Sequence, residues 1–250
     1  MLKHKIINCY IDNISYRNAL DKVVSLSISK RGYVCLVNVH MLIESYDDTH
    51  FCNIVNQSDL SLPDGMPVAK SFSLLYDIDQ KRIAGMNFIQ DIFFECRQHQ
   101  LKIFIYGSTD DVLLKTSDKL RKDFPGLEVS FFSPPFRPLT TQEKHDVIDM
   151  VNSASPDLIV VALGCPKQEK WMYEHRDLIS GCMVGLGGAL SVYAGEISRA
   201  PLWMQQAGLE WLYRLSKEPR RLFSRYAYTN SKFLMLLFVQ FLRVKFRGVK

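Results

Sequence analysis

The residues best suited to do chemistry lie in short turns that follow apolar runs. Asp64 lies between Pro63 and Gly65, so a rigid and a flexible residue hold its carboxylate on a tight turn at the end of an apolar segment. Such a placement suits a general base. An aspartate before a glycine is also a common turn former, and the residue types alone leave both interpretations open.

A second turn, residues 164–169, holds more reactive side chains. Its sequence, Gly-Cys-Pro-Lys-Gln-Glu, presents a cation, an amide and a carboxylate just before a helical segment. Lys167 can contact a phosphate, and Gln168 can hydrogen-bond a sugar or a base edge. The alternative is an ordinary helix start with solvated charges, and the spacing does not distinguish the two.

Glycines mark two further turns. Gly107, Ser108 and Thr109 offer free backbone N–H groups, two hydroxyls and a helix N-terminus, which together suit a diphosphate, although an ordinary helix cap fits equally well. The run Gly-Leu-Gly-Gly-Ala at 185–189, which includes Gly187, resembles half of a dinucleotide fingerprint. Its sixth position is Leu190, and no acidic residue follows at the usual distance, so a dinucleotide cofactor is disfavoured.

Metal ligands are not expected. Asp77 and Asp79 form a D-x-D pattern that can hold a divalent ion against a diphosphate, but they precede a polar segment and do not end a predicted strand. A solvated loop is the favoured interpretation. The six cysteines are scattered, without a Cys-x-x-Cys pair or zinc-type histidine spacing, which predicts mostly reduced core residues.

The turns must be positioned by strands and helices, which are predicted to alternate along the chain. Apolar runs of strand length, each followed by a turn and a helical pattern, occupy residues 33–39, 101–106, 127–132, 157–163 and 183–186. Helices are predicted from Asp110 to Asp123 and from about Thr141, whose hydroxyl can cap the second one. This order predicts an α/β fold, a Rossmann-like doubly wound and mainly parallel sheet with a C-terminal helical appendage, whose ligands bind beyond the carboxyl ends of the strands.

The charge of the chain is concentrated at one end. The 250 residues have ordinary globular composition, 47% hydrophobic and 23% charged, and a net charge of +5. Residues 214–250 contain ten Lys or Arg and one acidic residue, Glu218, whereas acidic residues outnumber basic ones in the remainder. A basic tail indicates a phosphate-bearing partner or an anionic membrane surface. The N-terminus has no signal-like apolar stretch, so a cytoplasmic location is expected.

The same tail contains seven consecutive apolar residues, Phe233–Val239, between Lys232 and Arg243. Even extended through Gln240 to Leu242, the run is about half the length that spans a bilayer. It fits an interfacial helix drawn to anionic lipid, and the alternative is a helix packed on the protein or on a sister subunit. Continuous Phe and Leu argue against a nucleic-acid partner, because nucleic-acid tails interleave aromatic and basic residues.

Six motifs, in order from about residue 33 to residue 225, resemble the WecG/TagA/CpsF glycosyltransferases, glycosyltransferase family 26. They are LPDGMP at 62–67, RIAG at 82–85, LGCPKQE at 163–169, GLGG at 185–188, RAP at 199–201, and GLEWLYR at 208–214 with EPRR at 218–221. The resemblance implies an inverting, metal-independent transfer of a sugar from a UDP-sugar to a polyprenyl-diphosphate-linked saccharide. The sugar would be of the N-acetylmannosamine, mannosaminuronic acid or glucose type, and no cofactor is expected.

The resemblance also assigns roles to residues. It implies that Asp64 is the catalytic base and that Asn38, Arg82 and Gln168 contact sugar and phosphate groups, which adds to the turn residues named above. The substrate-binding candidates are Asn38, His40, Arg82, Gly107, Ser108, Lys167, Gln168, Gly187, Arg214, Arg221 and Arg225. Fixed cations would stabilise the departing diphosphate.

The resemblance further divides the chain into a catalytic body with the nucleotide-sugar pocket, residues 1–205, and a basic helical appendage, residues 206–250. The appendage is expected to complete the active site and to dock on an anionic membrane through residues 217–250, on the inner face of the cell membrane. The polymers implied are cell-surface polysaccharides such as teichoic acid and exopolysaccharide. A homo-oligomer is left open.

Three positions depart from the family pattern. Leu36 replaces a common threonine, His40 replaces a small or acidic residue, and Ser191 replaces a frequent acidic residue, so the sequence leaves the sugar identities open. Two other classes of function compete with a glycosyltransferase. One is a nucleotide-cofactor oxidoreductase on the same fold, which the incomplete glycine fingerprint disfavours. The other is a non-enzymatic protein that binds partners through its basic tail.

Overall fold

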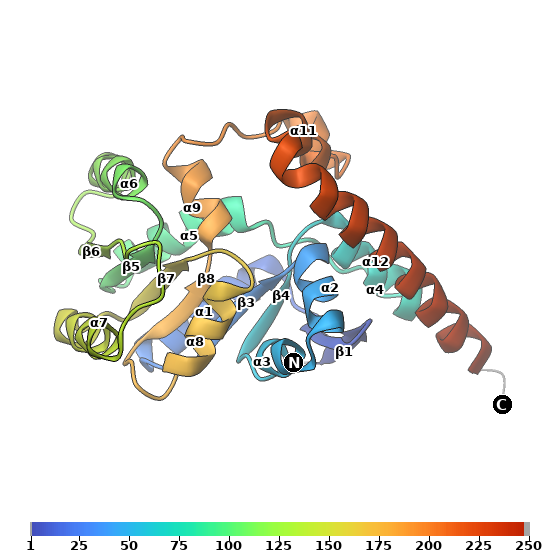
Figure 1. Ribbon diagram of the computed structural model, residues 1–250, viewed down its shortest axis with the longest axis horizontal. Coiled ribbons are helices and arrows are strands. Elements are labelled where there is room, and N and C mark those ends of the chain that lie inside the picture. The colour runs from blue at the N-terminus through green and yellow to red at the C-terminus, as the bar shows by residue number, and fades with distance from the viewer. Residues whose placement is uncertain (1, 248–250) are drawn as a thin grey trace.

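A six-stranded sheet, parallel throughout, forms the centre of the molecule (Figure 1), seen in a computed structural model that describes residues 2–247. The strand order is β4-β3-β8-β7-β5-β6. This confirms the predicted doubly wound α/β fold, and the predicted strands agree with the observed ones to within two residues at each end. The strands are β3 (Tyr33–Val37), β4 (Leu60–Pro63), β5 (Ile103–Gly107), β6 (Val129–Phe132), β7 (Leu158–Ala162) and β8 (Cys182–Gly185).

Helices cover both faces of the sheet, and this explains why its strands are almost entirely apolar. Successive residues of a strand point to opposite faces, so Val34 and Leu36 of β3 enter one core, and Tyr33, Cys35 and Val37 enter the other. The helices that contribute to the first core are α1 (Tyr16–Ile28), α5 (Gly85–Gln98), α6 (Asp110–Asp123) and α9 (Gly187–Tyr193). Those that contribute to the second are α2 (Val39–Asp47), α3 (Thr49–Asn56), α4 (Met66–Tyr76), α7 (Thr141–Ala154), α8 (Lys167–His175) and α12 (Pro219–Arg247).

Two short antiparallel strands, β1 (Lys3–Ile6) and β2 (Cys9–Asp12), form an N-terminal hairpin that the sequence pattern did not predict. The carboxylate of Asp12 accepts the backbone N–H of Ser61 at 2.8 Å and so attaches the hairpin to β4. All six cysteines carry free thiols, and four of them, Cys9 among them, are buried, as predicted.

Local capping sets the helix boundaries that the sequence pattern suggested. Helix α6 has the predicted bounds, and the Thr109 hydroxyl accepts the Val112 N–H at its start. The predicted cap of α7 was wrong by one residue. Thr140, not Thr141, forms the cap, because its hydroxyl accepts the Glu143 N–H while the Glu143 carboxylate accepts the Thr140 N–H.

Helix α12 runs along one side of the body beside α2 and α4 (Figure 1). Phe233 and Leu237 are buried against the body, whereas Leu234 and Phe238 are 64% and 60% exposed. The predicted apolar run therefore has two faces, one packed on the protein and one open to its surroundings. Within residues 2–247, no helix is long and apolar enough to cross a membrane.

Polar contacts hold the distal half of α12. Gln240 accepts the Ile7 N–H and donates to the Lys5 carbonyl, both at 2.7 Å. Lys245 pairs with Asp77 at 2.9 Å, so one aspartate of the D-x-D pattern takes part in helix docking. Two short helices, α10 (Leu202–Gln206) and α11 (Glu210–Lys217), connect α9 to α12.

Gly107 provides a test of how tightly β5 and β7 pack. Its φ is +106°, and a Cβ there would lie 2.7 Å from the backbone of Ala162. We expect Gly107→Ala to lower the free energy of unfolding by about 3 kcal/mol, because it adds a steric clash to a left-handed backbone. Gly195→Ala is the matched control, since Gly195 has φ +81° and open space around the Cβ position. Gly195→Ala should lower the free energy of unfolding by about 1 kcal/mol. If urea denaturation gives equal losses for the two variants, the close packing of β5 against β7 is contradicted.

Candidate active site

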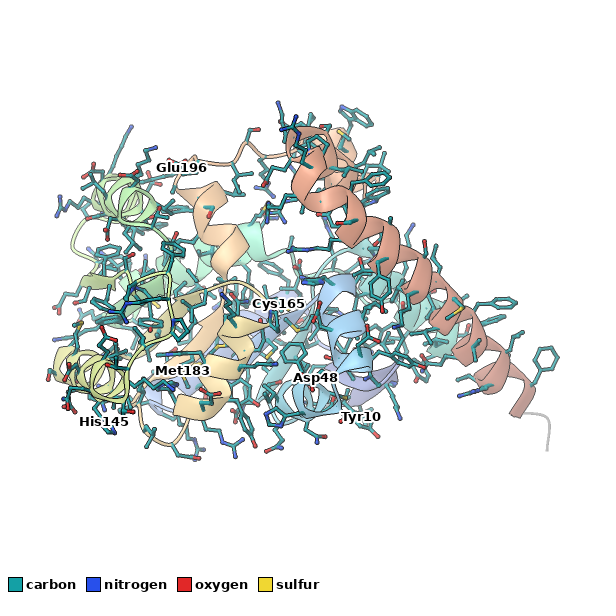
Figure 2. The ribbon with its side chains drawn as sticks, viewed as in Figure 1. Tyr10, Asp48, His145, Cys165, Met183 and Glu196 are labelled. Atoms are coloured by element: carbon teal, nitrogen blue, oxygen red, sulfur yellow. The ribbon has the colours of Figure 1, made fainter. Side chains whose placement is uncertain are left out.

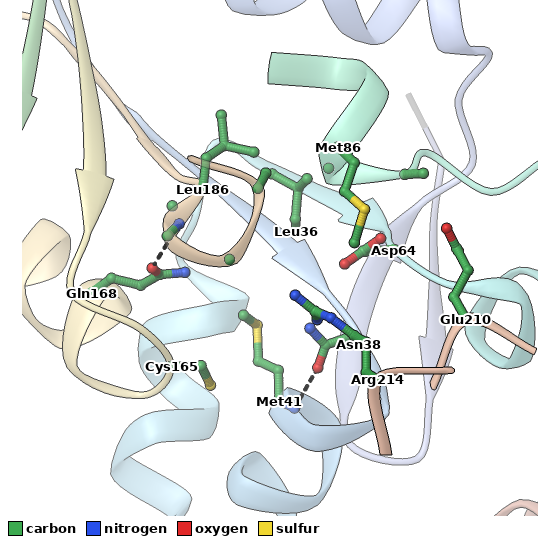
Figure 3. A pocket seen from close by; sticks show the side chains of 16 residues that line it. Leu36, Asn38, Met41, Asp64, Met86, Cys165, Gln168, Leu186, Glu210 and Arg214 are labelled. Atoms are coloured by element: carbon green, nitrogen blue, oxygen red, sulfur yellow. Dashed lines mark hydrogen bonds between the residues drawn. The ribbon is translucent and has the colours of Figure 1, made fainter. Parts of the chain in front are cut away.

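Four neighbouring strands end at one cavity of about 130 Å³ (Figure 3). The strands β4, β3, β8 and β7 are parallel neighbours, so the turns that follow them share one edge of the sheet. Helix α11 supplies the remaining side chains from the C-terminal part of the chain. The cavity is lined by Leu36, Asn38, Met41, Asp64, Ala84, Gly85, Met86, Cys165, Gln168, Gly185, Leu186, Gly187, Gly188, Ala189, Glu210 and Arg214.

Backbone hydrogen bonds fix the turn that carries Asp64. Its N–H donates to the Val37 carbonyl at 2.9 Å, and the Ile83 N–H donates to the Pro63 carbonyl at 2.9 Å. The turn is thereby attached both to β3 and to the segment that leads into α5. The Asp64 carboxylate is half-buried and lines the cavity (Figure 3).

The surroundings of Asp64 make its carboxyl group less acidic than usual. Burial, with a smaller contribution from the nearby Glu210 carboxylate, raises its pKa to about 6 against the opposing effects of the Gly85 N–H, Arg214 and Arg82. A carboxylate with a pKa near 6 is ionised at neutral pH and is a stronger base than an exposed aspartate. These are the properties of a general base.

The Gln168 amide forms the opposite wall of the cavity. Its Oε1 accepts the N–H groups of Gly164 at 3.2 Å and Gly187 at 3.4 Å. A Cβ at Gly187 would lie 3.0 Å from this oxygen, and a Cβ at Gly185 would lie 2.8 Å from Nε2. The glycine run at 185–189 therefore lets the amide lie flat against the turn between β8 and α9.

Glu169 contradicts the expectation of a helix start with solvated charges. Its side chain is fully buried, its Oε1 accepts the Gln168 amide at 2.7 Å, and its Oε2 has no hydrogen-bond partner among the described residues. Burial raises the pKa of Glu169 to about 7. This carboxyl group lies behind Gln168 and orients its amide, with Nε2 toward Glu169 and Oε1 toward the two glycines.

The predicted arginines differ in whether they line the cavity and in the groups they contact. Arg214 lines the cavity, with its Nη2 3.4 Å from where a Cβ of Gly188 would be, and within residues 2–247 it forms no ion pair. The Arg82 guanidinium pairs with the Glu210 carboxylate. Further out, Arg221 pairs with Glu218, and Arg225 lies near His40.

The residues that follow β3 divide between the cavity and its surroundings. Asn38 lines the cavity and also caps α2, because its Oδ1 accepts the Met41 N–H at 3.1 Å. His40 does not line the cavity; burial and the positive charge of Arg225 lower its pKa. Of the two other departures from the family pattern, Leu36 lines the cavity, whereas Ser191 on α9 does not.

Three further predicted binding residues, Gly107, Ser108 and Lys167, do not line this cavity. Gly107 and Ser108 lie at the end of β5, which is beyond β7 in the sheet, whereas Lys167 belongs to the turn of Gln168. Ser108 and Lys167 line a second groove of about 500 Å³, together with residues 134–139 and the Tyr106–Trp171 stack. Gly107 lines neither space and packs against the main chain of Ala162. The helix-cap interpretation of the 107–109 turn is confirmed for Thr109.

Sequence reasoning did not select Glu210 as a site residue. It lies in the 208–214 motif, four residues before Arg214, and both side chains reach the cavity from one face of α11. The four-residue spacing of a carboxylate and an arginine was the signal available in the sequence.

The fold and this cavity are those of a doubly wound α/β enzyme with a candidate carboxylate base and cations that suit an anionic substrate. The model of the WecG/TagA/CpsF family of glycosyl transferases matches residues 4–247, and the chain belongs to this family. It is accordingly a glycosyltransferase.

Two curated relatives are each named N-acetylglucosaminyldiphosphoundecaprenol N-acetyl-beta-D-mannosaminyltransferase. The one from Bacillus subtilis (strain 168) is 31% identical over 219 residues, which cover 84% of this chain and 84% of the relative. The one from Bacillus spizizenii is 30% identical over 197 residues, which cover 78% of this chain and 75% of the relative.

The raised pKa of Asp64 predicts a stability effect with a definite sign. A carboxyl group whose folded pKa is about 6, against an ordinary value of 3.8, contributes stability at low pH that is lost as the pH rises through 6. Asp64→Asn removes this loss. Its free energy of unfolding, relative to wild type, should therefore rise by about 1 kcal/mol between pH 5 and pH 8 in urea titrations.

Asp149→Asn, a change of an exposed carboxylate on α7, is the matched control. If the difference in the free energy of unfolding between Asp64→Asn and wild type does not vary with pH, the raised pKa of Asp64 is contradicted.

Proposed function

We propose that this glycosyltransferase moves a sugar of the N-acetylmannosamine type from a UDP-sugar to a polyprenyl-diphosphate-linked saccharide, with inversion and without a metal ion. The observation that carries the proposal is the half-buried Asp64 carboxylate in a cavity that also contains Arg214. The names of both relatives support the acceptor and the sugar type. The uronic acid and glucose types of donor remain outcomes of the assay below.

In this mechanism Asp64 accepts the proton of the acceptor hydroxyl. The hydroxyl oxygen then forms a bond to the anomeric carbon of the donor while the bond from that carbon to the diphosphate breaks, and UDP leaves with the electron pair. Attack from the face opposite UDP inverts the anomeric configuration. A base with a pKa of about 6 is largely ionised at pH 7.5 and is still basic enough to assist proton transfer.

The charge that develops on the departing diphosphate requires fixed donors. Arg214 faces the cavity and Arg82 lies at its edge, where limited hydration strengthens their attraction for phosphate. We assign Asn38 and Gln168 to the sugar hydroxyl groups. Ser108 and Lys167 would contact the donor from the second groove, which adjoins the cavity through α8.

The acceptor is a lipid, and we propose that α12 brings the enzyme to the inner face of the cell membrane. Leu234, Met235 and Phe238 are exposed on its outer face, and Arg243 follows on the same helix. Such a combination suits the interface of an anionic bilayer. Lys250, part of the predicted membrane-facing segment, lies outside the described residues.

An activity assay tests the transfer reaction. Incubation with a panel of UDP-sugars, a polyprenyl-diphosphate N-acetylglucosamine acceptor and EDTA should release UDP and give a larger lipid product with one donor. Asp64→Asn should lower kcat about 10²- to 10⁴-fold, because the variant has no base for the acceptor hydroxyl. Asp149→Asn should keep the wild-type rate. Absence of turnover with every donor, or a full rate for Asp64→Asn, would overturn the proposal.

Vesicle flotation tests membrane docking. Wild-type protein should float with vesicles that contain phosphatidylglycerol, and less so in high salt. The double variant Leu234→Glu/Phe238→Glu should bind at least about tenfold more weakly, because it places two charges on the apolar face. Leu178→Glu, a similar change at an exposed leucine after α8, is the control. Equal flotation of all three proteins would contradict docking through α12.

A further inference from the structure

Helix α11 lies over the active-site cavity without the apolar packing that usually fixes a helix. None of its eight residues is buried, and Trp211 and Leu212 are 37% and 42% exposed. Trp211 packs edge-on against Tyr226 of α12, which joins α11 to its neighbour in the C-terminal part of the chain. Helix α11 therefore reaches the body through α12, and a polar interaction adds a direct attachment.

The ion pair between Glu210 and Arg82 provides that interaction. Both side chains are largely buried, with 17% of Arg82 and 19% of Glu210 exposed. Of the side-chain hydrogen bonds and ion pairs among residues 2–247, this is the one that joins α11 to the chain before residue 198. Its partners are 128 residues apart in the sequence.

The same pair connects α11 to the turn that carries Asp64. Arg82 directly precedes Ile83, whose N–H donates to the carbonyl of Pro63, the residue before Asp64. The loop that Glu210 engages is thus hydrogen-bonded to the turn of the catalytic base. Glu210 itself lines the cavity that contains Asp64 (Figure 3).

The neighbouring groups that shift the pKa of Asp64 come from these two segments. Helix α11 contributes the Glu210 carboxylate and the Arg214 guanidinium, and the 82–85 loop contributes the Arg82 guanidinium and the Gly85 N–H. Glu210 is the anion of the set and raises the pKa of Asp64, whereas the other three groups lower it. Neutralising Glu210 leaves burial as the cause that raises the pKa of Asp64, while the remaining neighbouring groups favour its ionised form.

We propose that Glu210 is a positioning residue of the transfer reaction: its carboxylate holds the Arg82 guanidinium at the edge of the cavity, docks α11 through that pair, and sets the charge around Asp64. This inference rests on the proposed function, in which Asp64 takes a proton and Arg82 faces the diphosphate. Nothing in it requires Glu210 to touch a substrate. Its role is to couple the docking of α11 on the body to the charge environment that Asp64 needs as a base.

The test uses full-length Glu210→Gln, which keeps the shape of the side chain and removes its charge. In ¹³C NMR titrations the midpoint of Asp64 should fall by about one pH unit relative to wild type, and the acid limb of the kcat/KM profile should move to lower pH with it. Backbone amides of residues 210–217 should exchange hydrogen several times faster, because α11 has lost its attachment to the body.

Glu196→Gln is the matched control, since Glu196 pairs with Lys115 of α6 and lies outside the cavity (Figure 2). It should change neither the Asp64 midpoint nor the exchange rates of α11. A double-mutant cycle provides the third measurement. If Glu210 acts through Arg82, Glu210→Gln should lower kcat several-fold in wild type and much less in an Arg82→Gln background.

An unchanged Asp64 midpoint in Glu210→Gln, unchanged exchange in α11, or additive losses in the cycle would each overturn the inference. These outcomes differ from failure of the proposed function. If no UDP-sugar supports turnover by wild type, the transfer mechanism fails, whereas the NMR midpoint and the exchange rates still measure what Glu210 does to Asp64 and to α11.

Discussion

Parallel pairing of all six strands is the constraint on which the rest of the structure depends. It places the carboxyl end of every strand on one edge of the sheet, and the order β4-β3-β8-β7 then brings together turns that are far apart in the sequence. Asp64 and Gln168 line the same cavity because β4 and β7, the strands that precede them, lie three places apart in the sheet, although more than a hundred residues separate them. Glycines after β8 leave room for the Gln168 amide, so the cavity follows from backbone geometry as much as from its polar side chains.

The electrostatics of this cavity follow from limited hydration. A carboxylate that loses water becomes less acidic, and neighbouring charges then adjust how far its pKa moves. Here burial and Glu210 act against Arg82, Arg214 and the Gly85 N–H, and the resulting pKa of about 6 leaves Asp64 ionised at neutral pH and more basic than an exposed aspartate. Because Glu210 and Arg214 belong to α11, the state of the proposed base depends on a helix that lies outside the sheet.

Helix α12 shows how one apolar run can serve two surfaces. With 3.6 residues per turn, Phe233 and Leu237 fall on the side that packs against the body, and Leu234 and Phe238 fall on the other. Polar contacts with the N-terminal hairpin and with Asp77 hold its distal half. The helix can therefore remain attached to the catalytic body while it presents an apolar face to a lipid surface. Helix α11, which supplies Glu210 and Arg214 to the cavity, lies beside the start of α12 (Figure 1).

Much of this protein is determined by local sequence. Alternating apolar runs and turns predicted the parallel α/β fold, Thr109 and the following residues predicted α6 with its correct bounds, and Pro63 and Gly65 marked the turn of Asp64, because capping, turn chemistry and periodicity act over a few residues. Only the tertiary structure decided which turns share a cavity. Strand order separated Ser108 from Asp64, and the packing of α8 placed Lys167 in the second groove although its neighbour Gln168 lines the cavity. Long-range packing also buried Glu169 and paired Arg82 with Glu210 across 128 residues. These outcomes depend on crossover connections and long-range packing, which no local pattern of residues specifies.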